Sequence, residues 1–265
     1  MSDFVRAKKS YGQNFLNNDN ILEQIASLCG DGNRLVIEIG PGTGALTKKL
    51  SEKYALVRSV ELDTSLKNVL EENLSECSNV EILYEDFLKS DIKEIIGDWT
   101  GKVSVCANIP YYITAQIVEK LMDSSKYFEN VSLLVQKEVA DKLCAETGSG
   151  DAVPLTYKVR YYSSIRKCIS VAPGNFTPPP KVYSSVVKMD IRREESNPDF
   201  EKKLFKLIDA GFYQRRKKFV NSVSESGLYG KDALSSALNS LGIGIDVRGE
   251  NLTLEQYIAI TRELS

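Results

Sequence analysis

The stretch Glu38-Ile39-Gly40-Pro41-Gly42-Thr43-Gly44 decides the fold of this chain. It completes an apolar, β-branched run, Leu35–Ile39, and leads directly into a helical pattern near Leu46–Lys53. Glycines at such a strand-to-helix turn let the backbone reverse sharply and let a ligand approach it closely. The stretch therefore predicts a nucleoside site at the carboxyl edge of a parallel sheet.

Short β-branched runs and helical patterns alternate through the first two thirds of the chain. This alternation predicts βαβ units and an α/β fold, in which helices cover both faces of a mostly parallel sheet. The expected strands are Leu35–Ile39, Leu56–Glu61, Val80–Tyr84, Val103–Ala107 and Val131–Val135. The expected helices are Asn20–Cys29, Leu46–Lys53, Ser65–Leu74, Ala115–Met122 and Lys137–Ala145. Two β-rich stretches around a proline-rich loop, Ser164–Val171 and Ser184–Ile191, are expected to finish the sheet like a hairpin.

The pattern changes at a polar link that runs from Arg193 to Pro198. Beyond it, four helical patterns predict a small all-helical domain. They cover Asp199–Ala210, Gln214–Glu225, Asp232–Leu241 and Thr253–Glu263. The expected domains are therefore residues 1–193 and 194–265.

Composition excludes several classes of protein. The chain has 265 residues, of which 42% are hydrophobic and 26% charged, as in ordinary globular proteins. It has no histidine, which removes Ser-His-Asp, Cys-His and histidine-ligated metal mechanisms. No apolar run approaches the roughly 20 residues of a membrane span. Its five cysteines are scattered without a CxxC pair, so we expect reduced thiols, no metal site and a cytoplasmic location. A monomer is the default expectation, since the sequence carries no signal for oligomeric state.

The cofactor follows from the residues that surround the glycine turn. The spacing is GxGxG, Pro41 lacks one N–H that a pyrophosphate would use, and no P-loop sequence is present. Carboxylates predominate instead, at Glu38, Glu61 and Glu85-Asp86. They suit a ligand that carries an ammonium and a sulfonium, which is S-adenosylmethionine. Gly40 would allow close approach, Glu61 would bind the ribose hydroxyls, and Asp86 would accept an adenine amino proton or cap the next helix.

The fourth strand ends in Asn108-Ile109-Pro110-Tyr111, which predicts chemistry on an adenine amine. The N6 lone pair of adenine is delocalised into the ring, so the amine is a poor nucleophile. Two acceptors, the Asn108 side-chain oxygen and a backbone carbonyl around Ile109, would push it toward tetrahedral geometry. Pro110 would fix the turn, and Tyr111 would stack on the base.

Two further segments predict contact with nucleic acid. Phe176, in the proline-rich loop, is expected to be exposed and to act as a stacking platform for a flipped base, the alternative being a phenylalanine buried under its own loop. Lys158–Arg193 has eight basic residues and one acidic residue, so it is locally positive. A second basic cluster, expected to contact RNA phosphates, is Arg215, Arg216, Lys217 and Lys218. The alternative is that each charge run is an ordinary solvated surface.

These motifs together resemble the KsgA-type ribosomal RNA small-subunit adenine dimethyltransferases. The resemblance covers nearly the whole chain. The matching segments are Gly12–Leu16, the glycine turn, the Asn108–Tyr111 box, Gln136–Ala140, Phe176–Val182 and Phe212–Lys217, of which the first and the last are distinctive. It implies a Rossmann-like class I methyltransferase domain followed by a helical domain that recognises RNA or the ribosome. It also implies dimethylation of two adjacent adenines near the 3′ end of 16S-type rRNA in the immature small subunit. The cofactor residues that it implies are Asn14, Leu16, Gly40, Gly42, Glu61, Asp86 and Asn108.

Two other functions stay open at this point. One is methylation of large-subunit rRNA, which would confer macrolide resistance. The other is RNA binding without catalysis, as in ribosome assembly. The Phe212–Lys217 segment and Asn221 favour the small-subunit enzyme over the first, and the Asn108–Tyr111 box with Glu61 favours an enzyme over the second.

Overall fold

The computed structural model describes residues 14–30, 32–192 and 197–265, which form two compact units. The first unit holds the described residues up to Ala140 together with Ser164–Arg192. The second unit holds Asp141–Ser163 and the described residues from 197 onward. The expected boundary at residue 193 falls outside the described residues. Residues 141–163, expected in the first domain, cluster instead with the C-terminal helices.

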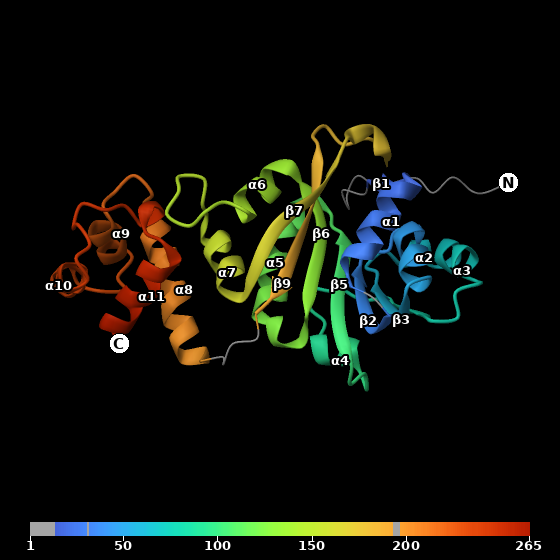
Figure 1. Ribbon diagram of the computed structural model, residues 1–265, viewed down its shortest axis with the longest axis horizontal. Coiled ribbons are helices and arrows are strands. Elements are labelled where there is room, and N and C mark those ends of the chain that lie inside the picture. The colour runs from blue at the N-terminus through green and yellow to red at the C-terminus, as the bar shows by residue number, and fades with distance from the viewer. Residues whose placement is uncertain (1–13, 31, 193–196) are drawn as a thin grey trace. The chain divides into compact units, whose positions relative to one another are not determined.

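The first unit is built on a seven-stranded sheet of order β4-β3-β2-β5-β6-β9-β7 (Figure 1). Its strands are β2 (Gly32–Ile39), β3 (Tyr54–Val60), β4 (Val80–Leu83), β5 (Lys102–Asn108), β6 (Asn130–Gln136), β7 (Ser163–Val171) and β9 (Ser184–Ile191). The pairs from β4 to β6 are parallel, whereas β9 runs antiparallel to β6. The predicted α/β, Rossmann-like sheet is confirmed, and the two late β-rich stretches occupy one end of it.

Helices cover both faces of this sheet. On one face, α1 (Asp19–Leu28) and α2 (Ala45–Ser51) bury Leu22 and Leu50 against Val36 and Val57 of the strands. Behind the strands in Figure 1 lies α5 (Thr114–Asp123), which buries Ile117, Val118 and Leu121. The remaining helices of four residues or more that start in this unit are α3 (Lys67–Asn73), α4 (Ile92–Ile96) and α6 (Lys137–Leu143). Because apolar side chains are covered on both faces, the central strands read as continuous apolar runs.

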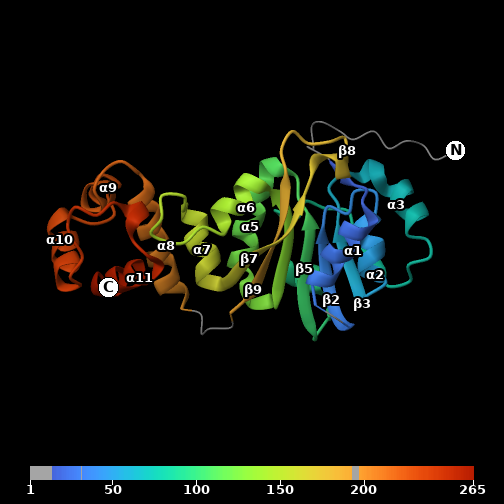
Figure 2. The same cartoon turned by 45° about the horizontal axis from the view of Figure 1, so that its top comes forward.

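A two-stranded sheet lies apart from the main one. It pairs β1 (Phe15–Leu16) with β8 (Phe176–Thr177) in antiparallel register, so that Leu16 lies opposite Phe176 (Figure 2 labels β8). Asn18 adds a side-chain hydrogen bond of 2.9 Å to Asn175. This pairing fixes the segment before α1 beside the proline-rich loop.

The second unit is helical and has its own core. Around it lie α7 (Pro154–Tyr162), α8 (Pro198–Phe212), α9 (Phe219–Glu225), α10 (Lys231–Ser240) and α11 (Leu254–Glu263). Tyr157 of α7 is fully buried, and its ring lies 5.3 Å from that of Tyr257 in α11. This burial is the physical reason why 141–163 belongs to the helical unit. At Gly211 of α8 a Cβ would lie 2.2 Å from the Tyr257 hydroxyl, so only glycine fits there.

The helix expected at Gln214–Glu225 begins later, at Phe219. Its first residues form a turn, in which the Gln214 N–H donates to the Ser222 side chain at 2.9 Å. Lys218 has an extended backbone, with ψ at 147°, which ends the turn before α9. The basic cluster is therefore on a turn between α8 and α9.

Candidate active site

One pocket in the first unit opens at the carboxyl ends of β2, β3 and β5 and beside the turn after β4. Ten of the eleven residues predicted for catalysis or cofactor binding line it, and Phe176 does not. The ten are Asn14, Leu16, Gly40, Gly42, Glu61, Asp86, Asn108, Ile109, Pro110 and Tyr111. Residues from five separate parts of the chain thus meet where parallel strands end, as expected for a ligand site in an α/β sheet.

The glycine turn forms the floor of this pocket between β2 and α2. Gly40, Gly42 and Gly44 all have positive φ angles, of 70°, 59° and 87°, which favour glycine over other residues. At Gly42 a Cβ would also lie 2.9 Å from the ring of Phe15 in β1. No atom lies within 4 Å of a Cβ placed on Gly40, so the space above that residue is open to a ligand.

Glu61, directly after β3, is fixed by the backbone on both carboxylate oxygens. Its Oε2 accepts a hydrogen bond from the Gly42 N–H at 3.2 Å, and its Oε1 accepts one from the Asp63 N–H at 2.7 Å. Burial raises the pKa of this carboxyl, and the two backbone hydrogen bonds oppose that rise. Each oxygen keeps another lone pair, so the side chain is arranged to accept two hydroxyl protons.

Asp86 follows β4 and caps the turn after it. Its Oδ1 accepts from the Leu88 N–H at 3.0 Å, while Oδ2 lies 3.5 Å from the Lys89 ammonium. The capping role that the sequence left open is therefore present. Because the side chain also lines the pocket, an acceptor for a ligand amino group is available at the same position.

Asn108 is the last residue of β5, and its side-chain amide has a defined orientation. The Nδ2 atom donates to the backbone carbonyl of Asn14 at 3.1 Å. With the nitrogen engaged there, Oδ1 is the atom of this amide that is free to act as an acceptor. The segment before α1 therefore orients the side chain on which the predicted chemistry depends.

Tyr111 lies on the pocket wall next to Asn108. Its hydroxyl forms a hydrogen bond of 2.8 Å with the Ser184 hydroxyl at the start of β9, and burial raises its pKa. Ile109 is buried, and the Pro110 carbonyl accepts from the Ile113 N–H at 3.3 Å. The box is thus held on both sides by bonds within the unit.

Glu38, the buried carboxyl beneath the glycine turn, is bound by two hydroxyls. Thr47 and Ser59 each donate to its Oε2 at 2.6 Å. Burial raises its pKa to about 7, against these hydrogen bonds, and nearby Glu61 adds to the rise. The charge of this side chain therefore changes close to neutral pH.

The expected exposure of Phe176 is wrong. The ring is 3% exposed and belongs to the apolar core with Leu16, Leu22 and Val171. Its pairing with Leu16 across the β1–β8 ladder turns it inward, so it is not available at the surface as a platform for a base. Sequence reasoning also missed several lining residues, among them Phe15, Leu62 and Tyr112. For Leu62 and Tyr112 the available signal was their position directly after Glu61 and Tyr111.

The basic cluster of the second unit is mostly ion-paired. Its acidic partners are Glu250 for Arg215 at 2.8 Å, Glu225 for Lys217 at 2.7 Å, and Asp246 for Lys218. Arg216 is exposed and has no ion pair within the part of the chain that the structure describes. Of the four cations, Arg216 is therefore the one whose charge is not already offset by a neighbouring carboxylate.

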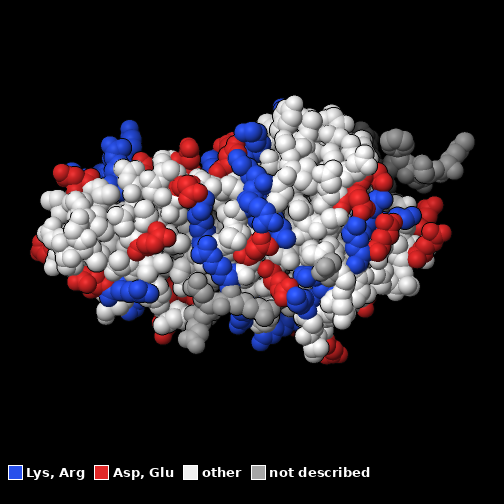
Figure 3. All heavy atoms as spheres, in the orientation of Figure 1, with Lys and Arg blue, Asp and Glu red and all other residues white. Residues whose placement is uncertain are grey.

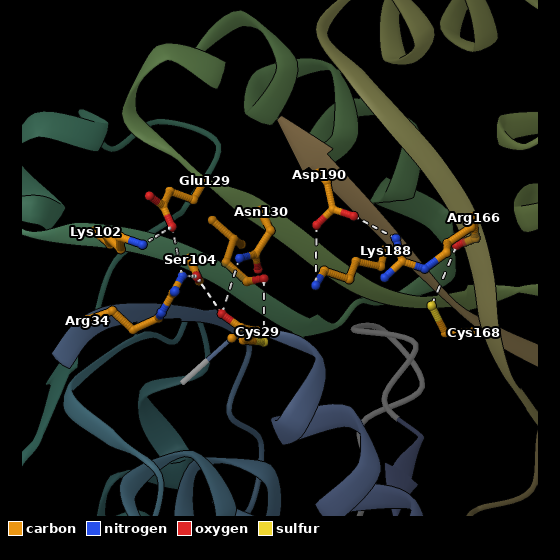
Figure 4. A network of polar contacts seen from close by, with 12 residues as sticks. Cys29, Arg34, Lys102, Ser104, Glu129, Asn130, Arg166, Cys168, Lys188 and Asp190 are labelled. Atoms are coloured by element: carbon orange, nitrogen blue, oxygen red, sulfur yellow. Dashed lines mark hydrogen bonds and ion pairs between the residues drawn. The ribbon is translucent and has the colours of Figure 1, made fainter. Parts of the chain in front are cut away.

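The other basic region keeps an excess of positive charge at β7 and β9. Figure 4 shows its single acid, Asp190, between Arg166 at 2.6 Å and Lys188 at 3.3 Å. Figure 3 shows Lys and Arg side chains gathered over these two strands. In residues 14–30, 32–192 and 197–265, no metal-binding group of His, Cys, Asp and Glu occurs, and no helix is long and apolar enough to cross a membrane.

Comparison with known proteins gives the family. The sequence profile described as Ribosomal RNA adenine dimethylase matches residues 4–265. The chain belongs to this family. It is 39% identical to the Ribosomal RNA small subunit methyltransferase A of Lachnoclostridium phytofermentans, and the match covers 94% of this chain and 89% of that protein. The protein of the same name in Mycoplasma mobile is 37% identical, with 97% of this chain and 98% of that protein covered.

Solved structures show the same fold. A dimethyladenosine transferase from Plasmodium falciparum has a TM-score of 0.76 and 24% identity, with 93% and 95% of the two chains covered. The 23S rRNA methyltransferase ErmE has a TM-score of 0.74 at the same identity, with 95% and 99% covered. As a member of this family, the chain is an S-adenosylmethionine-dependent methyltransferase that acts on rRNA adenines. The predicted enzyme class and the predicted cofactor are therefore confirmed.

Proposed function

We propose that this enzyme dimethylates N6 of two adjacent adenines near the 3′ end of small-subunit rRNA. The substrate particle is the immature small ribosomal subunit in the cytoplasm, the enzyme acts as a monomer without a metal, and the helical unit recognises the RNA or ribosome. The hydrogen bond from Asn108 to Asn14 carries the proposal, because it leaves the Asn108 oxygen to accept from an exocyclic amine. The curated relatives named for the small subunit favour this target over the large-subunit one.

The pocket fits S-adenosylmethionine chemically. Glu61 has both oxygens oriented by backbone N–H groups, as binding of two ribose hydroxyls requires. Gly40 offers open space above its Cα, and Asp86 offers an acceptor for the adenine amino group. When bound, the cofactor supplies an electrophilic methyl group on a sulfonium. Asn14 and Leu16 complete the wall of the site.

The residues of the box prepare the nucleophile. Asn108 Oδ1 and the backbone carbonyl of Ile109 would accept the two N–H bonds of adenine N6, so that the lone pair no longer lies in the ring plane. Pro110 shapes the turn, and the Tyr111 ring, held by Ser184, supports the base. No base of the protein is required, since the amine becomes acidic only after methyl transfer and then loses its proton to water. Positioning and preorganised polar contacts supply the rate enhancement.

The decisive experiment compares rRNA from cells with and without the gene by mass spectrometry. Loss of dimethyladenosine from small-subunit RNA, restored by the gene but not by its Asn108→Ala variant, is the expected result. Loss from large-subunit RNA instead would identify the macrolide-resistance activity. Unchanged amounts of dimethyladenosine in both RNAs would indicate an assembly factor without catalytic activity.

A further inference from the structure

Large apolar side chains that remain exposed in the first unit gather at the carboxyl edge of its sheet. In the part of the chain that the structure describes, those of this unit are Leu62, Tyr112, Val182 and Tyr183. Leu62 follows β3, Tyr112 follows β5, and Val182 with Tyr183 directly precedes β9, which starts at that edge. Exposed apolar groups gathered at one place mark a binding surface rather than ordinary protein surface.

Tyr112 belongs to the rim of the methyl-transfer pocket. It lines that pocket, follows Tyr111 directly, and is 60% exposed. Neither a hydrogen bond of its hydroxyl nor a ring contact is found among the described residues. Its ring is therefore presented to solvent beside the place where the target base enters.

Tyr183 also lies near Tyr111. Its carbonyl accepts from the Lys137 N–H at 2.9 Å, just beyond the end of β6, and the next residue, Ser184, binds the Tyr111 hydroxyl. Because β6 separates β5 from β9, Tyr183 lies roughly 10 Å from the end of β5, two strand spacings away. The side chain is 53% exposed.

The segment that carries Tyr183 also carries a cation. Lys181, Val182 and Tyr183 are all exposed, and Lys181 has no ion pair among the residues that the structure describes. An exposed aromatic ring beside an unpaired cation is the combination that binds single-stranded nucleic acid, since the ring stacks on a base and the cation contacts a phosphate.

We propose that Tyr112 and Tyr183 are stacking platforms for the nucleotides that flank the target adenine, and that Lys181 contacts a neighbouring phosphate. The inference rests on the proposed function and adds to it the way in which the enzyme holds an unpaired RNA segment. With two adjacent target adenines, the one outside the pocket needs a surface while the other reacts. The rim supplies that surface, a role for which the buried Phe176 is unavailable.

The test is steady-state kinetics of the full-length enzyme on small subunits purified from cells that lack the methyl marks. Tyr112→Ala and Tyr183→Ala should each raise KM for the particles about 5- to 150-fold, the range that corresponds to loss of one stacked base. The effect on KM should exceed the effect on kcat, and calorimetric affinity for S-adenosylmethionine should stay within twofold. Tyr112→Phe and Tyr183→Phe, which keep the rings, should behave like the unmodified enzyme.

Tyr127→Ala is the matched control, because Tyr127 is half-buried in the same unit but precedes β6 at the opposite edge of the sheet. The proposal is overturned if both rim alanine variants keep the unmodified KM, or if the phenylalanine variants are as defective as the alanine ones. Unchanged kinetics together with loss of binding to another protein would assign the rim to that partner instead. If the unmodified enzyme itself fails to methylate the particles, it is the proposed function that fails.

Discussion

The side-chain nitrogen of Asn108 donates to the backbone carbonyl of Asn14 at 3.1 Å, across 94 residues of sequence. Asn14 lies next to β1, which is held by its pairing with β8. The orientation of the amide that we propose to be catalytic thus depends on a ladder formed by a segment from the beginning of the chain and the proline-rich loop. Substitutions that weaken this ladder should therefore slow catalysis without touching a ligand.

Asn108→Ala should reduce the rate of methyl transfer about 10²- to 10³-fold, the scale for losing one preorganised polar contact in a transition state. Single-turnover measurements with radiolabelled S-adenosylmethionine on unmethylated small subunits give that rate. RNA affinity should change little, since Asn108 lines the pocket and is not one of the exposed cations expected to contact phosphates. The second methyl transfer should suffer as well, because the monomethylated amine retains one N–H. A single-turnover rate equal to that of the unmodified enzyme would exclude a role for Asn108 in methyl transfer.

Glu61→Ala should weaken S-adenosylmethionine binding about 10- to 150-fold, because hydrogen bonds to a charged group contribute about 1.5–3 kcal/mol. Isothermal titration calorimetry measures this directly, and RNA affinity should be nearly unaffected. The exposed carboxylate Glu76, which is not part of the pocket lining, provides a control, and Glu76→Ala should leave the affinity for the cofactor unchanged. Cofactor affinity unchanged by Glu61→Ala would exclude the ribose contact.

The sheet could be predicted from the sequence because its central strands are buried on both faces. Residues of β2 from Leu35 to Ile39 are all buried, and such a strand reads as a plain apolar run. The glycine turn and the strand-end carboxylates could be placed for the same reason, since parallel strands bring their carboxyl ends together. Eight of the ten predicted residues in the pocket follow from that rule, whereas Asn14 and Leu16 are implied only by the family resemblance.

Contacts between distant segments could not be predicted. Phe176 is buried because β8 pairs with β1, about 160 residues away, and neither two-residue strand has a periodic pattern of its own. The pairing of Arg215 with Glu250 and of Lys218 with Asp246 depends likewise on how the helical unit folds. A charge run shows how many cations are present, but not how many already have partners.

Arg216→Ala should therefore weaken RNA binding more than Arg215→Ala does, although both remove one positive charge. Loss of a phosphate contact should lower the slope of log affinity against log salt by about one, uniformly across RNA sequences. Arg215 engages Glu250, so its removal frees a carboxylate and should alter the slope less. Binding to small subunits is measured at four or more salt concentrations for both variants. Equal slopes for the two variants would show that the ion pairs do not determine which cation binds RNA.

Glu38 predicts a pH dependence of stability. Its folded-state pKa of about 7 lies above the ordinary value of 4.5, so the unfolded chain ionises first as pH rises. The contribution of this carboxyl to the free energy of unfolding is therefore fully present below about pH 4.5. It is lost as pH rises to about 7, by roughly 3 kcal/mol at most. Glu38→Gln should abolish this loss while keeping an acceptor for Thr47 and Ser59. Urea unfolding at pH 5 and pH 8 measures the difference in the free energy of unfolding, and Glu85→Gln is the exposed control. If both variants and the unmodified enzyme show the same difference between the two pH values, Glu38 is excluded as its source.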